Sequence, residues 1–343
     1  LTFPRKVSRE VRLRARPRGL PQPQDFEVVA APVPEPGDAE LLVQNRFVRV
    51  SASMRMMISE GAEAVDGVPF PALRPGDALR EAGVGEVISA PPDCAFSPGD
   101  LVVHHRGFCE IVAVPVDECE LVDPRLPDPA MNLAHGWTAY AALTRAGRVR
   151  EGDVVFVSSA GGAIGSMAAM IARKLGARRV IGSTSSADKA RRLRTELRYD
   201  DAVAREAGSI ADQLRRAAPD GIDVVIDSVG GEQLAAAIHV ARERARIVVL
   251  GALSGQLAPT GTGRSAPVTL DSFPILLKRL EIHGYSADDD PAARSEFHRL
   301  FADAIAEGAM SFPHERLRGL ESAPSALCDV AAGRYLGTVM IEV

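Results

Sequence analysis

The most constraining feature of the sequence is a short apolar run that leads into a glycine-rich turn and then into an apolar helix. The run Val154–Val157 is apolar throughout, which is typical of a central strand covered on both faces. The turn that follows, residues 158–165, contains Gly161, Gly162 and Gly165. Apolar residues then recur at helical spacing, which predicts a helix with one face against a sheet. A strand, a tight turn and a helix in this order indicate a dinucleotide-binding unit.

The glycine turn has the form A-x-G-x-x-G, with Ala160 at the first glycine position of the fuller motif. Gly162 lets the backbone approach a pyrophosphate, and Gly165 lets the helix pack closely on the strand. The first amides of the helix and its dipole favour an anion at this point. Glycine-rich turns also occur where chains only need tight packing, so the flanking strand and helix carry the nucleotide interpretation. The predicted cofactor contacts of the turn are Gly161, Gly162, Ala163, Ile164 and Gly165.

The choice between NADH and NADPH is expected about 20 residues after the glycines, where NAD enzymes place an acid on the ribose hydroxyls. The end of the second expected strand carries no acid here. Ser185 and Ser186 can hydrogen-bond a 2′-phosphate, and Lys189 can pair with it. A unit-charge pair about 4 Å apart is worth about 4 kcal/mol before desolvation at an effective dielectric near 20. We therefore expect NADPH, although Lys189 alternatively belongs to a solvated basic helix face with the arginines that follow it.

The length of 343 residues indicates about two domains. Residues 1–130 contain short valine-bearing runs separated by Pro and Gly turns, which is typical of an antiparallel β domain. Residues 131–289 alternate strands with helical stretches, the pattern of a doubly wound, parallel α/β sheet. Residues 290–343 contain a helical stretch at Ala293–Ala306 and then a β-like tail. We expect this last segment to return to the first domain.

Five strands are expected in the second domain, and the last of them is a candidate for self-association. They are Asp153–Ser158, Arg179–Ser183, Ile222–Asp227, Arg246–Gly251 and Leu280–Tyr285. The last is a short apolar strand at a sheet edge, and exposed edges invite partners. A homodimer is therefore expected.

Composition and charge exclude several classes of protein. The formal net charge of −5 argues against broad affinity for nucleic acid. A basic cluster from Arg5 to Arg18 alternates in part with valine and leucine, which favours a solvated strand face over a phosphate-binding arm. No apolar run approaches the ~20 residues that cross a bilayer and no signal-peptide core is found, so no membrane partner and a cytoplasmic location are expected. The four cysteines are too scattered for a disulfide framework.

Several segments beyond the glycine turn form a pattern when taken together. They are Ala31–Gly37, Ser53–Arg55, Gly136–Tyr140, Gly221–Gly231 and Gly251–Ser254. With them the chain resembles, nearly end to end, the medium-chain dehydrogenase/reductase superfamily, in the zinc-independent branch of prostaglandin reductases and alkenal double-bond reductases. The resemblance implies a GroES-like β-rich catalytic domain beside a Rossmann domain that binds NADPH. It also implies hydride transfer to the β-carbon of an α,β-unsaturated ketone or aldehyde, followed by protonation at the α-carbon.

Such a reaction needs the alkene and the nicotinamide held at near-attack distance and donors for the developing enolate oxygen, but no metal. The features of a catalytic zinc site are missing: there is no G-H-E-x-x-G around residues 76–85 and no cysteine in residues 48–55. His104 and His105 are adjacent on an expected strand and point to opposite faces, so they are poorly placed to share a metal. No metal site is expected.

The resemblance also implies cofactor contacts outside the glycine turn. Ser228 and Tyr335 stand where the family has asparagines, and Arg205 stands where it has a tyrosine near the adenosine phosphate, which strengthens the expectation of NADPH. Thr138 is expected to contact the nicotinamide through its hydroxyl, with a helix-start role as the alternative. The remaining contacts implied are Gly251, Ala252 and Leu253.

Three residues are catalytic candidates, and each has a plainer alternative. Gln256 replaces a family tyrosine; its amide can donate to a carbonyl or enolate oxygen but is no practical proton source. The proton then comes from water, from the substrate or from Tyr140, a residue that is otherwise packed with its hydroxyl satisfied. Arg55 either orients a substrate carbonyl or carboxylate or forms an ion pair between domains. It follows Ser51–Met54, where the family has an aromatic wall, so a wider pocket for the small-molecule substrate is expected.

Two acidic features of the sequence each have a functional and a structural interpretation. Asp227 ends an apolar strand, where an orienting role is at least as plausible as that of a general base. Asp288–Asp290 suggests a cation site or, more simply, a solvated loop.

The alternatives to enone reduction are an NADPH:quinone oxidoreductase, which needs no dedicated proton donor, and an NADPH-binding protein without turnover.

Overall fold

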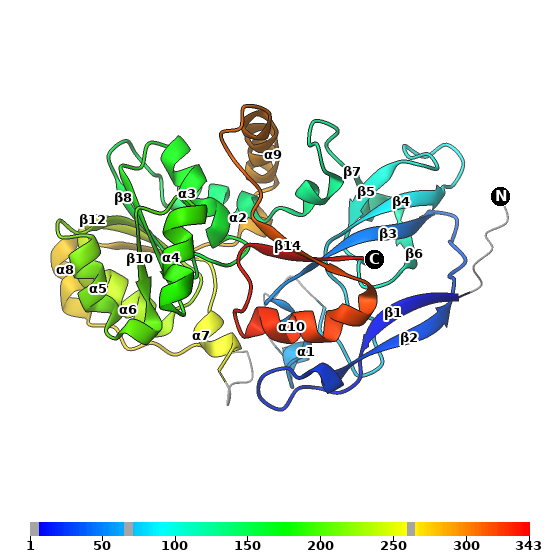
Figure 1. Ribbon diagram of the computed structural model, residues 1–343, viewed down its shortest axis with the longest axis horizontal. Coiled ribbons are helices and arrows are strands. Elements are labelled where there is room, and N and C mark those ends of the chain that lie inside the picture. The colour runs from blue at the N-terminus through cyan, green and yellow to red at the C-terminus, as the bar shows by residue number, and fades with distance from the viewer. Residues whose placement is uncertain (1–6, 65–70, 259–264) are drawn as a thin grey trace. The chain divides into compact units, whose positions relative to one another are not determined.

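The computed structural model describes residues 7–64, 71–258 and 265–343 (Figure 1). Its contacts divide the chain into two units. The N-terminal unit comprises the chain up to Ala134 with Glu315–Arg334 and Val339–Val343, and the Rossmann unit comprises His135–His314 and Tyr335–Thr338. This division differs from the expected boundary at residue 290. Helix α9 (Pro291–Ala306) belongs to the Rossmann unit, because its buried residues Phe297 and Phe301 pack on the side of α2 (Gly136–Ala141).

The N-terminal unit is built from two antiparallel arrangements of strands. β1 (Val7–Leu13) pairs with β2 (Phe26–Pro32). A seven-stranded sheet has the order β14, β15, β3, β4, β5, β7, and β6 also pairs with β3. Their bounds are His314–Arg318 (β14), Thr338–Glu342 (β15), Glu40–Val50 (β3), Gly83–Ser89 (β4), Leu101–His104 (β5), Glu120–Leu121 (β7) and Ile111–Pro115 (β6). The expectation of an antiparallel β domain is confirmed, and the C-terminal strand β15 returns to pair with β3.

Strand β1 has the solvated face that its alternating sequence predicts. Val11 and Leu13 are fully buried. Arg9, between them and the start of the strand, is exposed and pairs with Glu110, while Arg12 pairs with Glu10. Arg5 and Lys6 lie outside the described residues. The described part of the unit also contains the α-helices α1 (Met54–Ile58) and α10 (Ala323–Ala331).

The Rossmann unit contains a six-stranded sheet in which neighbouring strands are parallel. The order is β10, β9, β8, β11, β12, β13, with bounds Asp201–Ala204, Arg179–Thr184, Val154–Val157, Ile222–Asp227, Ala241–Val249 and Glu281–Gly284. All five expected strands are present. β10 is not anticipated from the sequence, because its four residues, Asp-Ala-Val-Ala, form no apolar run, and β12 begins five residues before the expected Arg246.

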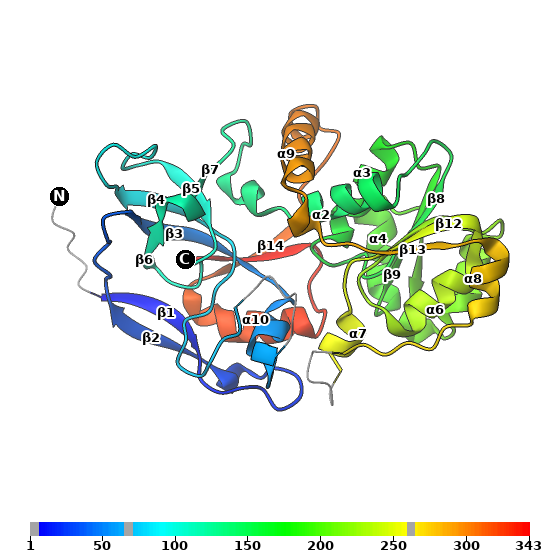
Figure 2. The same ribbon diagram turned by 180° about the vertical axis from the view of Figure 1, so that it is seen from behind.

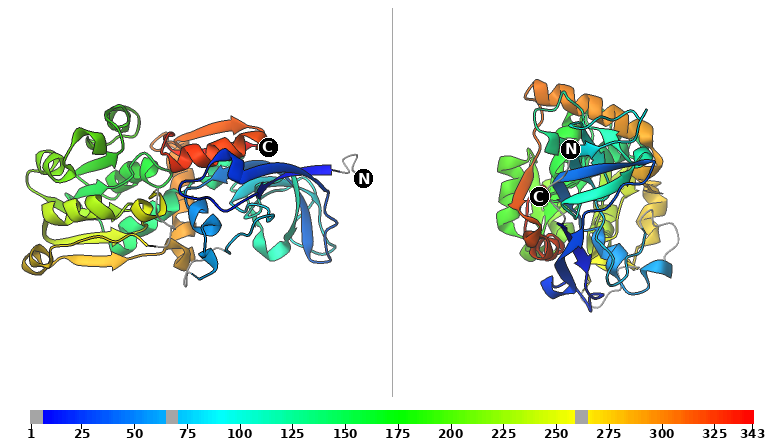
Figure 3. Two further views of the ribbon diagram at one scale, coloured as in Figure 1. Left: turned by 90° about the horizontal axis from the view of Figure 1, so that it is seen from below. Right: turned by 90° about the vertical axis from the view of Figure 1, so that its right-hand side faces the viewer.

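Helices lie on both faces of this sheet (Figure 3). α3 (Gly165–Lys174) contacts α2 and β9, and α4 (Ala187–Glu196) packs on β9 and β10. α5 (Ile210–Ala217), α6 (Gly231–Val240) and α8 (Ser272–Lys278) form a second contiguous set. The strand order reverses between β8 and β11, so the carboxyl ends of these two strands form the switch point at which such sheets bind ligands. The doubly wound α/β fold is therefore confirmed.

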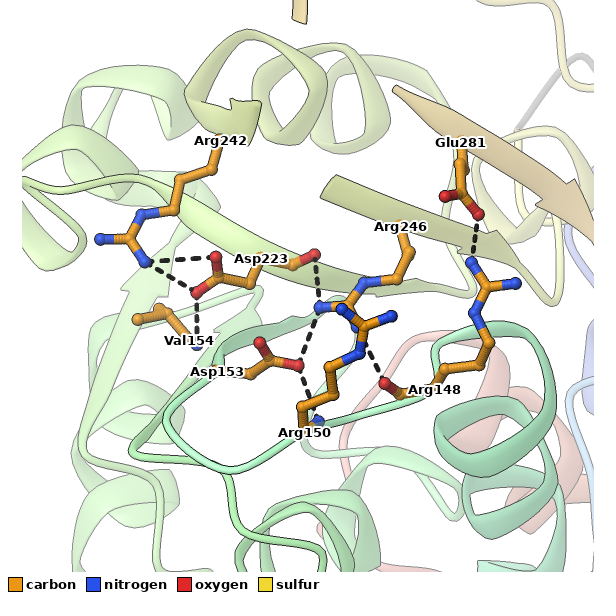
Figure 4. A network of polar contacts seen from close by, with 8 residues as sticks. All are labelled: Arg148, Arg150, Asp153, Val154, Asp223, Arg242, Arg246 and Glu281. Carbon is orange, nitrogen blue, oxygen red and sulfur yellow. Dashed lines mark hydrogen bonds and ion pairs between the residues drawn. The ribbon is translucent and has the colours of Figure 1, made fainter. Parts of the chain in front are cut away.

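The opposite, amino ends of the central strands carry a buried ion-pair network (Figure 4). The Arg246 guanidinium, whose side chain is 7% exposed, donates to the Asp153 carboxylate at 2.8 Å and to the Arg148 carbonyl at 2.8 Å. Asp223 accepts from the backbone N–H of Val154 at 2.8 Å and pairs with Arg242 at 3.1 Å. The network ties β12 to β11 and to the entry of β8, so it fixes the register of the strands that carry the switch point.

Removing one carboxylate from this network should be costly, because it leaves a buried guanidinium without its partner charge. We expect Asp153→Ala to lower the free energy of unfolding of the Rossmann unit by about 3 kcal/mol. The measurement is amide hydrogen exchange of β8, β11 and β12. Arg191→Ala, in an exposed pair with Asp188, is the control and should cost less than about 0.5 kcal/mol. A change of less than about 1 kcal/mol for Asp153→Ala would contradict the assignment.

Candidate functional site

The glycine turn after β8 is closely packed around Gly165. A Cβ atom at this position would lie 2.5 Å from the Ser159 carbonyl oxygen and 2.6 Å from the Ala160 Cα, so only glycine fits. Ser159 itself adopts a φ of 52°, and the Ala160 N–H donates to the Ser183 carbonyl of β9 at 2.8 Å. Helix α3 therefore starts directly against the strand end. The Gly162, Ser166 and Met167 N–H groups donate to the Ser159, Gly162 and Ile164 carbonyls at 2.9, 2.8 and 3.3 Å. An anion at this helix start would therefore use the other amides of the turn and the positive end of the helix dipole.

A segment from the end of the chain completes this turn. The Gly337 N–H donates to the Gly161 carbonyl at 2.9 Å, and Leu336 lies against Gly161. The Tyr335 carbonyl accepts from the Lys189 ammonium at 2.6 Å. Tyr335–Thr338 thus belongs to the Rossmann unit rather than to the returning tail, because its backbone is bonded to the turn. In the sequence, Tyr335 is a candidate only because of the family resemblance, and the bonding of this segment to the turn is not predicted. Gly337, which adopts a φ of 89°, is the residue that could have indicated an unusual backbone there.

The loop after β11 is organised by the buried carboxylate of Asp227. It accepts from the Ser158 hydroxyl at 2.7 Å and from the Gly230 N–H at 2.7 Å. The Ser228 N–H in turn donates to the Ser158 hydroxyl oxygen at 2.9 Å. Burial raises the pKa of Asp227, and these donors oppose the rise. Asp227 therefore joins the loops that follow β8 and β11. This arrangement favours the orienting role considered from the sequence over that of a general base.

The loop after β12 closes on the same edge of the sheet. The Leu253 N–H donates to the Ser228 carbonyl at 3.1 Å, and a Cβ at Gly251 would lie 3.1 Å from that oxygen. Ala252 precedes the short helix α7 (Leu253–Gln256), and Gln256 ends it half-buried. The structure therefore brings Ser228 and Gly251–Leu253 together at the carboxyl ends of β11 and β12, next along the sheet to β8.

The four residues expected around a 2′-phosphate follow β9 and β10, which are neighbours in the sheet. The Ser186 hydroxyl caps α4 by accepting from the Lys189 N–H at 3.3 Å. Burial, with the nearby positive charge of Arg192 as a smaller cause, lowers the pKa of the Lys189 ammonium. The Ser185 backbone carbonyl accepts from the Glu206 N–H at 3.2 Å, and Arg205 is exposed on the turn after β10. Cationic groups and hydroxyls at one strand edge suit an anionic phosphate.

Thr138 and Tyr140 both lie on α2 and differ in how their hydroxyls are used. The Thr138 hydroxyl is buried, and no described residue accepts or donates a hydrogen bond to it. A buried polar atom of this kind costs free energy unless a ligand bonds it. The Tyr140 hydroxyl donates to Glu296 of α9 at 3.1 Å. Burial and the bond to Glu296 raise the pKa of Tyr140. The satisfied hydroxyl matches the alternative given from the sequence, in which Tyr140 is a packed residue and not a catalytic one.

The acidic run that ends at Asp290 serves the Rossmann unit internally. Asp290 caps α9 by accepting from the Ala293 N–H at 2.9 Å. It also pairs with Arg145 at 2.9 Å, and Arg145 bonds Glu296 at 2.8 Å. A helix cap with an ion pair accounts for Asp290 without a cation. Arg55 is buried in α1 of the N-terminal unit, and Tyr140 and Gln256 belong to the Rossmann unit.

The adjacent histidines His104 and His105 of the N-terminal unit differ in burial, as expected for neighbouring residues at the end of a strand. His104 is buried and His105 is exposed. The His104 Nε2–H donates to Asn45 Oδ1 at 2.8 Å, and Nδ1 accepts from the Arg106 N–H at 3.1 Å. Both ring nitrogens are therefore engaged by protein groups. Within the described residues, no group of three or more His, Cys, Asp or Glu side chains is arranged to hold a metal ion.

The neutral His104 ring should make the N-terminal unit sensitive to acid. Burial lowers the pKa of His104 to about 3, against about 6.5 in the unfolded chain. Its contribution to stability is complete above pH ~6.5 and is lost as the pH falls toward 3, by about 2 kcal/mol between pH 7.5 and 5. We expect His104→Gln, which cannot titrate, to lose correspondingly less stability over that interval, as measured by hydrogen exchange of β4 and β5. Equal losses in the two proteins would refute this.

Comparison with known proteins agrees with this fold and site. Residues 9–122 match the family described as the N-terminal domain of oxidoreductase, and residues 163–306 match the one described as zinc-binding dehydrogenase. A Bacillus subtilis (strain 168) protein named as an NADP-dependent oxidoreductase is 32% identical over 97% of both chains. The NADPH-dependent curcumin reductase of Escherichia coli (strain K12) is 28% identical over 96% of this chain and 95% of that protein. The crystal structure of CurA from Vibrio vulnificus in complex with NADPH superposes with a TM-score of 0.86 and 25% identity, over 98% of this chain and 99% of that one.

A Rossmann unit with a glycine turn at its switch point, a GroES-like β unit and these relatives together identify an NADP-dependent oxidoreductase. The chain belongs to the medium-chain dehydrogenase/reductase superfamily, in its reductase branch. The resemblance found in the sequence is thereby confirmed, and so is NADP(H) as the cofactor. No helix among the described residues is long and apolar enough to span a bilayer.

Proposed function

We propose that this chain reduces the carbon–carbon double bond of α,β-unsaturated ketones or aldehydes with NADPH and without zinc. The observation that carries the proposal is similarity along nearly the full length to reductases of such compounds. Besides the curcumin reductase, relatives at 27% and 26% identity are named 2-alkenal reductase in Nicotiana tabacum and (+)-pulegone reductase in Mentha piperita. Curcumin, 2-alkenals and pulegone share a carbon–carbon double bond conjugated with a carbonyl group.

NADPH supplies the hydride when it is bound, and the residues of the chain position and polarise the reactants. The glycine turn Gly161–Gly165 at the start of α3 would hold the pyrophosphate through its close backbone approach and its amides not used within the turn. The Thr138 hydroxyl, which no described residue satisfies, bonds the nicotinamide carboxamide. The Gln256 side-chain amide donates to the substrate carbonyl, where the bond strengthens as negative charge develops on oxygen.

The proton for the α-carbon is supplied by water or the substrate rather than by a side chain of α2. The Tyr140 hydroxyl already donates a hydrogen bond to Glu296, and the raised pKa makes it a weaker acid than a free tyrosine. Gln256 has no acidic proton in the accessible pH range. Hydride transfer with solvent protonation remains feasible, because an enolate is basic enough to take a proton from water.

The proposal predicts a ranking of acceptors in stopped-flow measurements of NADPH oxidation. We expect 2-alkenones to be reduced faster than quinones, with the alkane ketone as the product. Gln256→Leu should lower kcat/KM for 2-alkenones by about a hundredfold, the usual effect of losing one donor to a developing oxyanion. Ser254→Ala, an exposed neighbour on α7, is the control and should change little.

Two outcomes would overturn the proposal. Fast reduction of quinones without hydride transfer to any alkene would identify a quinone oxidoreductase; the solved quinone oxidoreductase of Escherichia coli shares the fold at 17% identity. Tight binding of NADPH with no turnover of either class would identify a binding protein.

We further propose that two copies of the chain pair through the β13 edge of the Rossmann sheet. β13 is the terminal strand of its sheet, and α8 lies at the same end (Figure 2). Large apolar side chains are exposed there: Leu276 at 70%, Phe273 at 63%, Leu277 at 57% and Ile282 at 39%. An exposed strand edge with adjacent apolar surface favours association with a second identical edge.

Light scattering of the native protein should give twice the mass of one chain. Leu276→Glu combined with Leu277→Glu should shift the mass to that of the monomer, because two buried charges would oppose each other across the pair. Leu121→Glu, an equally exposed apolar position in the N-terminal unit, is the control and should leave the dimer intact. A native protein with only monomer mass would rule out the pairing.

A further inference from the structure

A carboxylate lies in the part of the cofactor site that the sequence assigns to a phosphate. Glu206 is exposed on the turn Arg205–Ala207, directly after β10. Its carboxylate accepts from the backbone N–H of Ala187, the first residue of α4, at 2.6 Å. Its own N–H donates to the Ser185 carbonyl at 3.2 Å. Glu206 therefore bridges the loops that follow β9 and β10.

This bond uses an amide that would otherwise be available to an anion. The first amides of a helix have no acceptor within the helix, and the helix dipole favours negative charge at this end. In α4, the Lys189 amide is satisfied by the Ser186 hydroxyl, and the Ala187 amide is satisfied by Glu206. The chain thus places its own negative group at the end of α4 where Ser185, Ser186 and Lys189 are expected to receive the 2′-phosphate of NADPH.

The charges around this loop pair are consequently mixed. Lys189 and Arg205 each contribute a positive charge, and Glu206 contributes a negative charge at the helix end. Asp188, in the first turn of α4, is paired with the exposed Arg191. A 2′-phosphate brings between one and a half and two negative charges at neutral pH, so it is repelled by a carboxylate in the same loop. The 2′-hydroxyl of NADH carries no charge and can donate a hydrogen bond to a carboxylate, as it does to the acids of NAD enzymes.

We propose that Glu206 is a specificity-determining residue of the cofactor site that weakens the preference for NADPH over NADH. When a 2′-phosphate binds, the Glu206 carboxylate either gives up its hydrogen bond to the Ala187 amide or keeps it and is repelled by the phosphate. Both outcomes weaken phosphate binding. The chain therefore accepts NADH more readily than its serines and lysine alone would allow. The inference rests on the assignment of the 2′-phosphate to the β9 and β10 loops, which is part of the proposed site.

The test measures binding of cofactor fragments by calorimetry, without substrate or turnover. The probes are 2′,5′-ADP, which carries the 2′-phosphate, and 5′-AMP, which lacks it. Glu206→Gln keeps an oxygen that can accept from the Ala187 amide but removes the charge. We expect it to tighten 2′,5′-ADP by about tenfold and to change 5′-AMP by less than about threefold. NADPH and NADH should show the same pattern.

Two matched variants make the result specific. Glu196→Gln is the same substitution at the other end of α4, about 15 Å away along the helix, and should change neither affinity. Lys189→Ala should weaken 2′,5′-ADP selectively.

An unchanged 2′,5′-ADP affinity in Glu206→Gln, or an equal gain in Glu196→Gln, would overturn the role of Glu206. A Lys189→Ala protein that binds 2′,5′-ADP as well as the native one would remove the phosphate assignment and the inference with it. Failure to reduce any alkene would refute only the proposed reaction, because the fragments report on binding alone.

Discussion

The contact of α3 with the end of β8 is the constraint on which the cofactor site depends. Gly165 has no side chain, and the Ser159 carbonyl and Ala160 Cα occupy the place where a Cβ would be. This closeness aims the first amides of α3 at the space beyond the sheet. It also brings Ala160 next to β9, where a Cβ at Gly182 would lie 2.6 Å from the Ala160 Cβ. The turn thus depends on the absence of a side chain at Gly165 of α3 and at Gly182 of β9.

The C-terminal segment makes this turn a long-range structure. Gly337 bonds Gly161, and Tyr335 bonds Lys189, across more than 140 positions of sequence. The segment lies between α10 and β15, both of which lie in the N-terminal unit apart from Thr338 at the start of β15. The bonds that Gly161 and Lys189 make here are therefore supplied by the end of the chain. Local sequence can specify the strand, turn and helix, but not this closure.

The sequence predicts the parts of the fold that depend on local pattern and misses those that depend on tertiary partners. Ile222–Asp227 is a strand with the expected bounds, because an unbroken apolar run between turn residues leaves few alternatives. β10 is missed because its Asp and Ala residues become a strand only by pairing with β9. At the site, the glycines are identifiable since their role follows from lacking a side chain. The bond of Tyr140 to Glu296 and that of Glu206 to Ala187 are not, because both join residues whose proximity is set by packing.

The two ends of the Rossmann sheet show how stability and ligand binding are separated. At the amino ends, Arg246, Asp153 and Asp223 bond one another and the backbone, so the buried charges there are compensated within the protein. At the carboxyl ends, Asp227 is likewise compensated, whereas on α2 of the same unit the Thr138 hydroxyl has no acceptor or donor among the described residues. A buried group left unsatisfied beside a satisfied framework lowers stability, and it persists where a ligand supplies the missing bond. The rigid amino ends thus support the carboxyl ends, where NADP(H) supplies that bond in our proposal.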